Sequence, residues 1–301
     1  MHDLAIQTSN LTKRYGHSTA LQGLNLEVPR ESIFALLGPN GAGKTSLFKI
    51  LTGLASPTSG EARVLGYQVS TNETAFRAKI GYVAENPVLY GYYTAREMAN
   101  FCASLYPRWN PRLVDSAFKQ FSIPVDKKIK EFSHGQKSAL TLTLALGPEP
   151  ELLILDEPGA GLDPIKRRDY FKLLMEQVVA LGSTVLLSSH TLHEVERLAD
   201  RVAFLSRGRL VAVKDVADLK TAEKRIRVVF QGRPPEDVFK QTGIARVEPE
   251  GSGYLLTVTE NVHEVLEKLS QYPHFALEII DLDLEDIFIE YTRREGADRN
   301  G

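Results

Sequence analysis

Over its first 215 residues, the chain alternates between short apolar runs and longer stretches of helical periodicity. The apolar runs have the length of strands that are buried on both faces of a sheet. They lie at residues 32–37, 79–83, 152–155, 184–187 and 202–205. Because helical stretches separate the runs, the pattern predicts an α/β core.

Proline positions mark the starts of two helices. One proline follows Asn110 and another follows Asp163. Asparagine and aspartate are favoured helix caps, and proline is favoured at the first helical position. The sequence therefore predicts helices over about 111–121 and 164–181. Residues 87–147 contain helical patterns but no convincing strand, so we expect a helical insertion between strands of the sheet.

Both ends of the chain have the pattern of antiparallel sheets. The first thirty residues alternate short apolar strands with turns and predict a small sheet of this kind. After about residue 220 we expect a strand, a short helix, a hairpin, a helix, a strand and a last helix. These elements lie at 225–230, around 250–253, and at 262–270, 275–281 and 284–292. The order resembles a ferredoxin-like split βαβ unit, so we expect two domains, 1–219 and 220–301.

Composition narrows the class of protein. With 301 residues and 43% hydrophobic composition, the chain can bury a core for one large and one smaller domain. Its net charge of −2 lacks the broad basic field of a general nucleic-acid binder. The single cysteine, Cys102, predicts a reducing compartment. The start does not resemble a signal peptide, and no window has the roughly eighteen apolar residues of a membrane span, so we expect a cytoplasmic protein.

Residues 38–46 match the pattern of a phosphate-binding loop between a strand and a helix. Its glycines allow a tight turn whose N–H groups point at phosphate oxygens, and the next helix adds the positive end of its dipole. Lys44 would reach the β- and γ-phosphates, and the Thr45 hydroxyl would bind magnesium. A glycine-rich turn without ligand is the disfavoured alternative. The loop consists of Gly38, Pro39, Asn40, Gly41, Ala42, Gly43, Lys44, Thr45 and Ser46.

Two carboxylates, Asp156 and Glu157, follow the apolar run 152–155. The carboxyl end of a buried strand is where a nucleotide-binding sheet needs such groups. Asp156 would hold magnesium through its water shell, and Glu157 would deprotonate the attacking water as general base. A solvated acidic turn is the alternative, which the phosphate-binding loop makes less favourable.

Residues 132–136 read Phe-Ser-His-Gly-Gln at the head of an apolar helix. Ser133 and the backbone of Gly135 at a helix N-terminus would form a second anion site, or an ordinary helix cap. Together with the two nucleotide motifs, this stretch resembles the Leu-Ser-Gly-Gly-Gln signature of ATP-binding cassette (ABC) ATPases, the motor subunits of ABC transporters. The resemblance covers about residues 4–215.

The resemblance implies a composite site. In this family two subunits pair head to tail, so that the signature of one closes over the nucleotide held by the other. The residues involved here would be Ser133, Gly135 and Gln136. Residues 160–163 resemble the loop that crosses the dimer interface, which assigns Asp163 to the nucleotide site.

Two more positions match the family. His190 resembles the switch histidine that contacts the γ-phosphate, although a polar loop histidine is the alternative. Tyr15 resembles the aromatic residue that stacks on adenine with its flat apolar face, although a surface tyrosine is the alternative.

Three positions depart from the family pattern or leave alternatives open. Glu85 stands where the family usually has a glutamine that touches magnesium, and its carboxylate still offers an oxygen to the metal. His134 replaces the first glycine of the signature, either as a pH-sensitive phosphate contact or as a solvent-facing ring. Trp109 is either an interface anchor or a core residue that braces a turn.

The resemblance also implies a fold and an activity. The fold would be a P-loop NTPase of the ABC type, with a RecA-like core, an antiparallel β subdomain, a helical subdomain over about 87–147 and a small α+β C-terminal domain. The protein would use ATP and Mg²⁺, pair with a second copy and drive a separate membrane permease at the cytoplasmic face, as in exporter-type members. Alternatives are a soluble cassette acting on ribosomes or DNA, which the near-neutral charge disfavours, and a scaffold without turnover. We expect no nucleic-acid partner.

Overall fold

The computed structural model describes residues 3–70, 75–189, 192–222, 224–232, 234, 236–281 and 286–287. The chain forms two compact units. One comprises residues 1–190 and 201–212, and the other comprises 191–200 and 213–301. The expected division of the chain after residue 219 stays a prediction.

A six-stranded sheet forms the centre of the first unit, in the order β11-β10-β4-β9-β8-β7. The pairs from β10 to β7 are parallel. The strands are β4 (Ile33–Leu37), β7 (Ile80–Val83), β8 (Leu152–Leu155), β9 (Thr184–Ser188), β10 (Arg201–Ser206) and β11 (Arg209–Asp215). Strands β4, β8 and β9 are buried along their whole length. The five predicted strands and the α/β core are confirmed.

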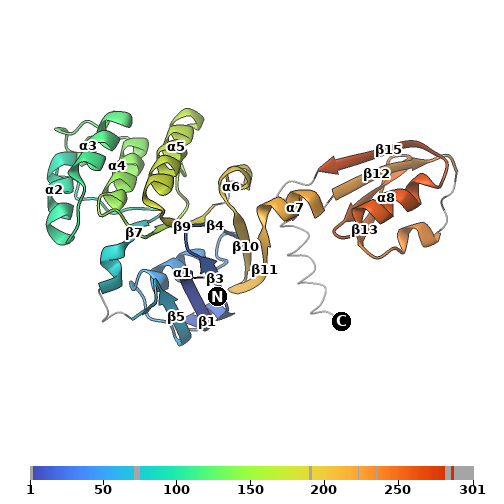
Figure 1. Cartoon of the computed structure of the whole chain (residues 1–301), viewed down its shortest axis with the longest axis horizontal. Coiled ribbons are helices and arrows are strands. Elements are labelled where there is room, and N and C mark those ends of the chain that lie inside the picture. Colours follow the sequence, from blue (N-terminus) through green and yellow to red (C-terminus); the bar gives the residue numbers. More distant parts are fainter. Residues whose placement is uncertain are drawn as a thin grey trace. The chain divides into compact units, whose positions relative to one another are not determined.

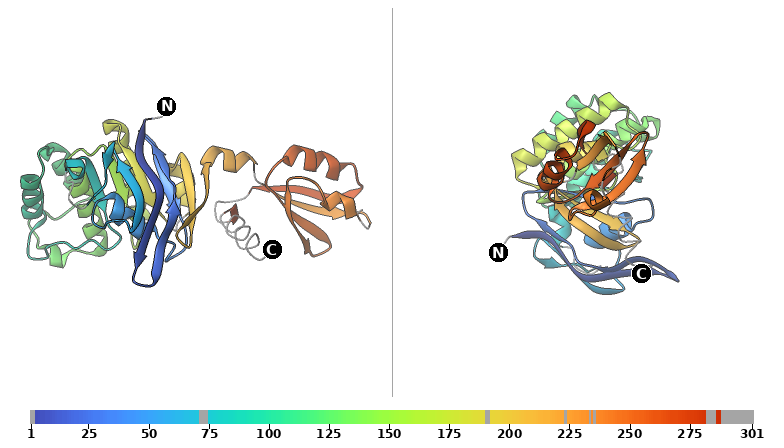
Figure 2. Two further views of the ribbon diagram at one scale, coloured as in Figure 1. Left: turned by 90° about the horizontal axis from the view of Figure 1, so that it is seen from below. Right: turned by 90° about the vertical axis from the view of Figure 1, so that its right-hand side faces the viewer.

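A second sheet of the first unit is antiparallel and has the order β2-β1-β5-β6, with β3 paired to β1. Its strands are β1 (Leu4–Tyr15), β2 (Ser18–Leu24), β3 (Glu27–Pro29), β5 (Ser59–Val64) and β6 (Tyr67–Gln68). The left view of Figure 2 shows β1 as a long blue strand running across this sheet. The antiparallel sheet predicted for the first thirty residues is confirmed, but it is larger, because β5 and β6 join it after helix α1 (Lys44–Leu51).

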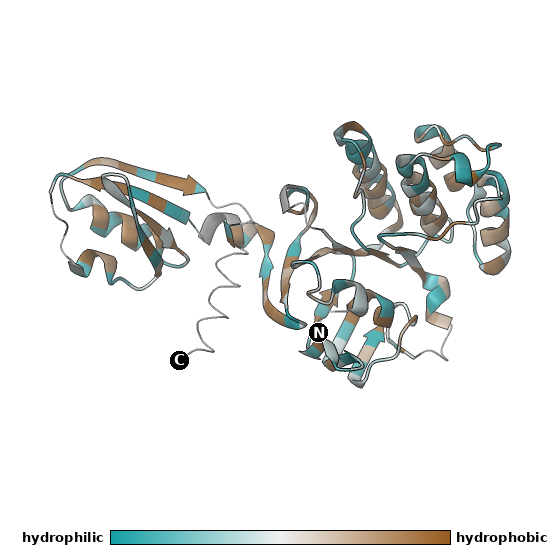
Figure 3. Cartoon of the chain, turned by 180° about the vertical axis from the view of Figure 1, so that it is seen from behind, coloured by the Kyte–Doolittle hydropathy of each residue, from teal (hydrophilic) through white to brown (hydrophobic). Residues whose placement is uncertain are grey.

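Helices α2 (Ala95–Leu105), α3 (Pro111–Gln120) and α4 (His134–Leu146) form the predicted helical insertion. Two short 3₁₀ helices, η1 (Ala75–Lys79) and η2 (Ile129–Glu131), lie before and within it. The three long helices share an apolar core that includes Met98, Phe118 and Leu140. They lie side by side in Figure 1, and in Figure 3 they carry both brown and teal stretches, as amphipathic helices do.

The two helix starts expected at prolines are confirmed. The Asn110 side chain accepts a hydrogen bond of 3.0 Å from the N–H of Leu113 at the start of α3. Asp163 caps α5 in the same way, accepting a hydrogen bond of 3.0 Å from the N–H of Lys166. Helix α5 spans Pro164–Leu181. These bonds satisfy N–H groups that a helix start otherwise leaves without partners.

Trp109 lies immediately before α3 and is partly buried against the core of the helical insertion. A Cβ atom on Gly147, at the end of α4, would lie 2.5 Å from the Trp109 ring. The N–H of Asn110 donates a hydrogen bond of 2.8 Å to the Gly147 carbonyl oxygen. Of the two interpretations of Trp109, the structure therefore favours a residue that braces a turn.

Tyr170 of α5 is fully buried between Phe121 and Phe171, and burial raises the pKa of its phenol. Among the described residues, its hydroxyl has no hydrogen-bond partner. A buried hydroxyl without a partner destabilises the folded state. We therefore expect Tyr170→Phe to raise the free energy of unfolding by about 1 kcal/mol, measured by urea denaturation.

The exposed Tyr67 provides the control for this substitution. Tyr67→Phe removes a hydroxyl that water can satisfy, so the free energy of unfolding should stay within about 0.5 kcal/mol of the parent. A Tyr170→Phe protein less stable than the parent would show that the buried hydroxyl contributes favourably.

The second unit contains the elements predicted after residue 220. Helices α6 (Leu192–Leu198) and α7 (Val216–Ala222) belong to it, followed by β12 (Lys224–Phe230), η3 (Glu236–Phe239), β13 (Ile244–Glu250), β14 (Gly253–Val258), α8 (Val262–Ser270) and β15 (His274–Asp281). The sheet has the order β13-β14-β12-β15, with antiparallel neighbours. This is the strand order of a split βαβ unit. The last predicted helix, 284–292, lies outside the described residues except for 286 and 287.

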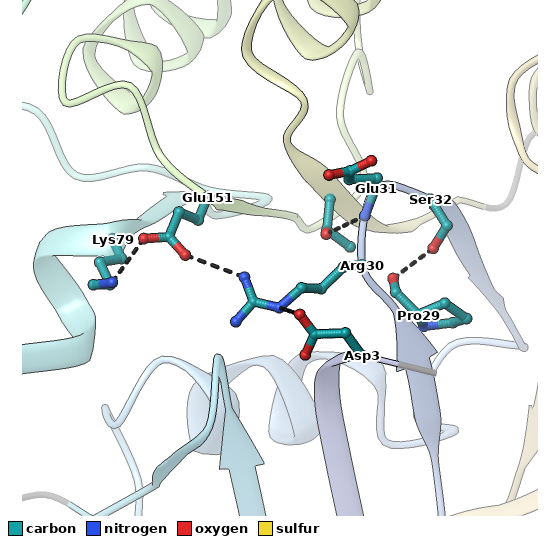
Figure 4. A network of polar contacts seen from close by, with 8 residues as sticks. Asp3, Pro29, Arg30, Glu31, Ser32, Lys79 and Glu151 are labelled. Carbon is teal, nitrogen blue, oxygen red and sulfur yellow. Dashed lines mark hydrogen bonds and ion pairs between the residues drawn. The ribbon is translucent and has the colours of Figure 1, made fainter. Parts of the chain in front are cut away.

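A network of charged side chains holds the amino ends of the parallel strands (Figure 4). Arg30 lies 2.9 Å from Asp3 and 3.2 Å from Glu151, and Lys79 lies 2.7 Å from Glu151. The hydrogen bond from Lys79, followed by that from Arg30, lowers the pKa of the Glu151 carboxyl. Glu151 precedes β8 and Lys79 precedes β7, so this network lies at the amino edge of the sheet. Ligands of such sheets bind at the opposite, carboxyl edge.

Candidate nucleotide-binding site

A cavity of about 770 Å³ lies at the carboxyl edge of the parallel sheet, where β4 and β8 end. Its lining brings together the complete predicted phosphate-binding loop, both predicted carboxylates and Glu85. It also includes three residues of β2 that the sequence did not indicate. The lining consists of Ser18, Thr19, Ala20, Gly38, Pro39, Asn40, Gly41, Ala42, Gly43, Lys44, Thr45, Ser46, Glu85, Asp156 and Glu157.

The phosphate-binding loop is held closely between neighbouring strands. Gly43, directly before α1, has a φ of 112°, which only glycine adopts readily. A Cβ atom there would lie 2.4 Å from the carbonyl oxygen of Ala20. A Cβ atom on Gly38 would lie 2.4 Å from the carbonyl oxygen of Leu205 in β10. The close approach of backbone therefore requires glycine at both positions, and at Gly43 the positive φ requires it as well.

Lys44 is the first residue of α1, and its side chain is almost fully buried and lines the cavity. Its ammonium donates a hydrogen bond of 2.6 Å to the carbonyl oxygen of Gly38. The Oε1 atom of Glu157 lies 3.4 Å from the same Nζ atom. An ammonium has three protons, so the geometry is compatible with a further acceptor in the cavity.

Asp156 is buried, with 1% of its surface exposed, and its two carboxylate oxygens have different surroundings. Oδ1 accepts a hydrogen bond of 2.8 Å from the Ser188 hydroxyl. Oδ2 is buried and has no hydrogen-bond partner among the residues that the structure describes. Leaving a carboxylate oxygen in this state is costly unless a cation satisfies it. Asp156 and Thr45 line the same cavity, so this donor set fits a hard divalent cation such as Mg²⁺.

The negative charge of Asp156 affects the pKa of the nearby Tyr82. Burial and then the Asp156 carboxylate raise the pKa of Tyr82, in β7, to about 12. The phenol therefore stays protonated at neutral pH. Glu85, two residues after β7, lines the cavity from a more exposed position.

Glu157 has an unusual backbone conformation, with a φ of 51°. The left-handed region costs a residue with a side chain roughly 1–2 kcal/mol. The Glu157 N–H donates a hydrogen bond of 2.9 Å to the Ser188 hydroxyl, which offsets part of this cost. In this conformation the carboxylate lies beside Lys44. Ser188 was missed as a site residue by the sequence analysis, and its signal was a polar residue closing an apolar strand.

The signature residues form the start of α4. Ser133 caps the helix and makes a capping box with Gln136, with hydrogen bonds of 3.3 Å and 2.9 Å. His134 is exposed, and its Nε2 atom lies 2.9 Å from the carbonyl oxygen of Ala160. Of the two interpretations of His134, the exposed ring fits the solvent-facing one, but this ring also contacts the loop that follows Glu157.

Besides Tyr15, four of the predicted nucleotide-binding residues do not line the cavity of their own chain. Ser133, Gly135 and Gln136 lie at the start of α4, and Asp163 caps α5. The N–H of Lys166 lowers the pKa of the Asp163 carboxyl. The structure thus brings together one half of the expected composite site and places the other half at two helix starts.

Tyr15 and His190 complete the predicted set. Tyr15 is about half exposed at the end of β1, and the backbone register pairs it with Ser18, which lines the cavity. The Nζ atom of Lys13 lies 4.9 Å from the centre of the Tyr15 ring. His190 lies outside the described residues.

Comparison with known proteins gives consistent matches. The family model described as ABC transporter matches residues 21–160. The Nod factor export ATP-binding protein I of Neorhizobium galegae is 33% identical over 97% of this chain and 86% of its own length. The bacitracin transport ATP-binding protein BcrA of Enterococcus faecalis is 35% identical over 74% of this chain and 73% of its own length.

A solved structure described as the ATP binding subunit of an ABC transporter covers 72% of this chain and 92% of its own, with 29% identity and a TM-score of 0.67. The predicted cassette fold and the predicted class of ATPase are confirmed by these similarities. This chain therefore belongs to the family of ABC transporter ATP-binding proteins.

Proposed function

We propose that this protein is the ATP-hydrolysing subunit of an exporter, and that two copies pair on ATP to drive a separate membrane permease. The observation that carries the proposal is the cavity in which Lys44, Asp156 and Glu157 meet the phosphate-binding loop. The name of one relative, which refers to Nod factor export, supports the direction of transport, and that of another, which refers to bacitracin transport, supports a role in transport.

The phosphate-binding loop would hold the triphosphate. The first N–H groups of α1 lack partners within the helix and carry the positive end of its dipole. Residues 38–46 line the cavity around them, and the Lys44 ammonium adds a full positive charge. Tyr15, at the end of β1, would stack on the adenine ring. These groups bind ATP mainly through its phosphates.

Magnesium would be held by Thr45 and Asp156, with Glu85 as a further oxygen ligand. When bound, the cation would neutralise charge that develops on the phosphate oxygens during transfer. The buried Oδ2 atom of Asp156 supports this assignment because it lacks another partner among the described residues.

Glu157 would accept the proton of the attacking water. Its carboxylate projects into the cavity beside Lys44, within 3.4 Å of the ammonium that would bind the β- and γ-phosphates. A base in this place can reach a water aligned behind the γ-phosphate. His190 would contact the γ-phosphate from the end of the neighbouring strand, as the family resemblance implies.

A second copy of the chain would complete the site. Ser133, Gly135 and Gln136 present a helix start and a hydroxyl, which suit an anion, yet they stand apart from their own cavity. Head-to-tail pairing would bring them, with Asp163, over the nucleotide of the partner copy. This pairing explains why one chain carries two separate phosphate-binding features.

A groove of about 320 Å³ between the sheet and the helical insertion would receive the permease. Its lining is mostly apolar or aromatic and includes Leu54, which is 61% exposed, with Tyr82 and Tyr106. Burial raises the pKa of the Cys102 thiol in the same groove, so the thiol stays protonated and serves for packing. Tyr82 lines this groove, and its pKa is raised in part by the charge of Asp156, which lines the nucleotide cavity. The groove and the nucleotide site therefore interact electrostatically through these two residues.

The permease would supply the membrane attachment. Within the described part of the chain, we find no helix that is both long and apolar enough to cross a bilayer. The protein would accordingly lie at the cytoplasmic face of the membrane, bound to its partner.

Affinity purification from detergent-solubilised membranes tests the proposed function. Co-purification of a polytopic membrane protein whose presence stimulates phosphate release would support it. Recovery of ribosomes or DNA in place of a membrane protein would instead support the soluble cassette, and absence of phosphate release even with the permease would support a scaffold.

Glu85→Gln is expected to keep ATP hydrolysis but to change its magnesium dependence. Loss of one carboxylate from the cavity removes a charged ligand, so the Mg²⁺ concentration for half-maximal activity should rise by about 2- to 10-fold. A magnesium titration of ATPase activity measures the effect. Glu61→Gln, which removes an exposed carboxylate from β5, is the control, and superimposable titrations of Glu85→Gln and the parent would contradict the prediction.

A further inference from the structure

The hydroxyl of Ser188 contacts both carboxylate residues of the site. Ser188 is the last residue of β9, and it is fully buried. Its Oγ atom donates a hydrogen bond of 2.8 Å to Oδ1 of Asp156 and accepts one of 2.9 Å from the N–H of Glu157. One side chain thus fixes two consecutive residues of the neighbouring strand end.

The sheet register produces this contact. Leu155 of β8 pairs with Leu187 of β9 in parallel register. The next residues along the two strands, Asp156 and Ser188, therefore lie beside each other at the carboxyl edge of the sheet. A small polar residue at this position can satisfy a buried carboxylate without occupying the cavity.

For Asp156, the hydrogen bond separates the functions of the two carboxylate oxygens. Ser188 satisfies Oδ1, while Oδ2 remains buried and unpartnered among the described residues, on a side chain that lines the cavity. A hydroxyl is neutral, so it orients the carboxylate without competing with a cation for its charge. A lysine or arginine at position 188 would compete with the metal cation, because its positive charge would neutralise the Asp156 carboxylate.

For Glu157, the same hydroxyl holds the backbone. The Glu157 N–H is bound while the residue adopts its φ of 51°, the conformation that places the carboxylate 3.4 Å from Lys44. Without this acceptor, a part-buried N–H would lose its partner, and the left-handed conformation would lose a stabilising contact.

We infer that Ser188 is a positioning residue that aims Asp156 at the magnesium ion and Glu157 at the attacking water. This inference rests on the proposed function, because it concerns the same site. In this role Ser188 aligns Asp156, the metal ligand, with Glu157, the base. Ser188 does not need to contact ATP. Supporting groups that orient metal ligands typically change metal affinity or activity by about 10- to 100-fold when removed.

The test compares Ser188→Ala with Ser188→Thr. The affinity for a fluorescent ATP analogue is measured in EDTA and again with Mg²⁺, and ATP hydrolysis is measured on the same proteins. Ser188→Ala should keep the metal-free affinity, lose most of the gain that Mg²⁺ gives, and lower kcat by about 10- to 100-fold. Ser188→Thr keeps the hydroxyl and should restore both quantities.

Ser183→Ala is the matched control. Ser183 is also a buried serine, directly before β9, but its hydroxyl donates to the carbonyl oxygen of Pro150 at the amino edge of the sheet. Its removal should lower thermal stability while the Mg²⁺-dependent gain in affinity stays at the parental value. Ser188→Cys retains side-chain volume but is a weak donor, so it should show the same loss as alanine if Ser188→Ala does not fold.

Two results would overturn the inference. One is an Mg²⁺-dependent gain and a kcat in Ser188→Ala and Ser188→Cys that equal those of the parent. The other is an equal loss in Ser183→Ala, which would reduce the effect to general destabilisation. Failure of the proposed function is distinguishable, because the parent protein itself would then show no ATP binding or no phosphate release.

Discussion

Glu157→Gln is expected to bind Mg-ATP and form a stable dimer while hydrolysing ATP no faster than about one hundredth of the parental rate. General-base catalysis contributes roughly 10²- to 10⁴-fold, and glutamine has no carboxylate to accept the proton. The amide keeps the size of the side chain, so nucleotide binding should persist. Size-exclusion chromatography with Mg-ATP and a phosphate-release assay measure the two outcomes.

Glu151→Gln is the matched control for this change. Glu151 precedes the same strand, β8, but its carboxylate contacts Arg30 and Lys79 at the amino edge of the sheet. Its neutralisation should leave hydrolysis close to the parental rate and produce no ATP-stabilised dimer. Near-parental turnover in Glu157→Gln would remove Glu157 from the role of base.

Lys44→Ala is expected to weaken the binding of ATP and to abolish measurable hydrolysis. A hydrogen bond to a charged group contributes about 1.5–3 kcal/mol, so loss of the ammonium should raise the Kd for ATP by about 10- to 100-fold. The ammonium also lies 3.4 Å from the Glu157 carboxylate, so its loss removes a positive charge beside the base as well as beside the phosphates. Equilibrium binding of a fluorescent ATP analogue measures the first effect.

Lys49→Ala provides the comparison on the same helix. Lys49 is exposed in the last turn of α1 and does not line the cavity. Its removal should leave the affinity for ATP unchanged within about a factor of two, since surface substitutions seldom exceed roughly 0.5 kcal/mol. Parental affinity in Lys44→Ala would show that backbone N–H groups alone carry phosphate binding.

The features that sequence predicted well depend on local chemistry. The glycines of the phosphate-binding loop, the caps Asn110 and Asp163, and the run that ends in Asp156 each leave a signal within a few residues. The parallel strands were predicted because strands buried on both faces are continuously apolar. The structure places all nine loop residues and both carboxylates at one cavity, as these local signals indicated.

The features that sequence did not predict depend on contacts between distant segments. Ser188 meets Asp156 only because of the register between β8 and β9. Ala20 approaches Gly43 because β2 runs past the phosphate-binding loop. His134 reaches Ala160 across 26 positions of the chain. Such contacts leave no periodicity or motif, so they become visible only in three dimensions.

If two copies pair head to tail as proposed, the separation of Ser133 from the cavity of its own chain would have a genetic consequence. In a head-to-tail pair, a chain with a damaged signature would still hold its own ATP but would leave the nucleotide of its twin uncovered. The lesion would therefore act in trans. In a cell that makes both forms, damaged chains would inactivate sites carried by intact ones, and such alleles would be dominant.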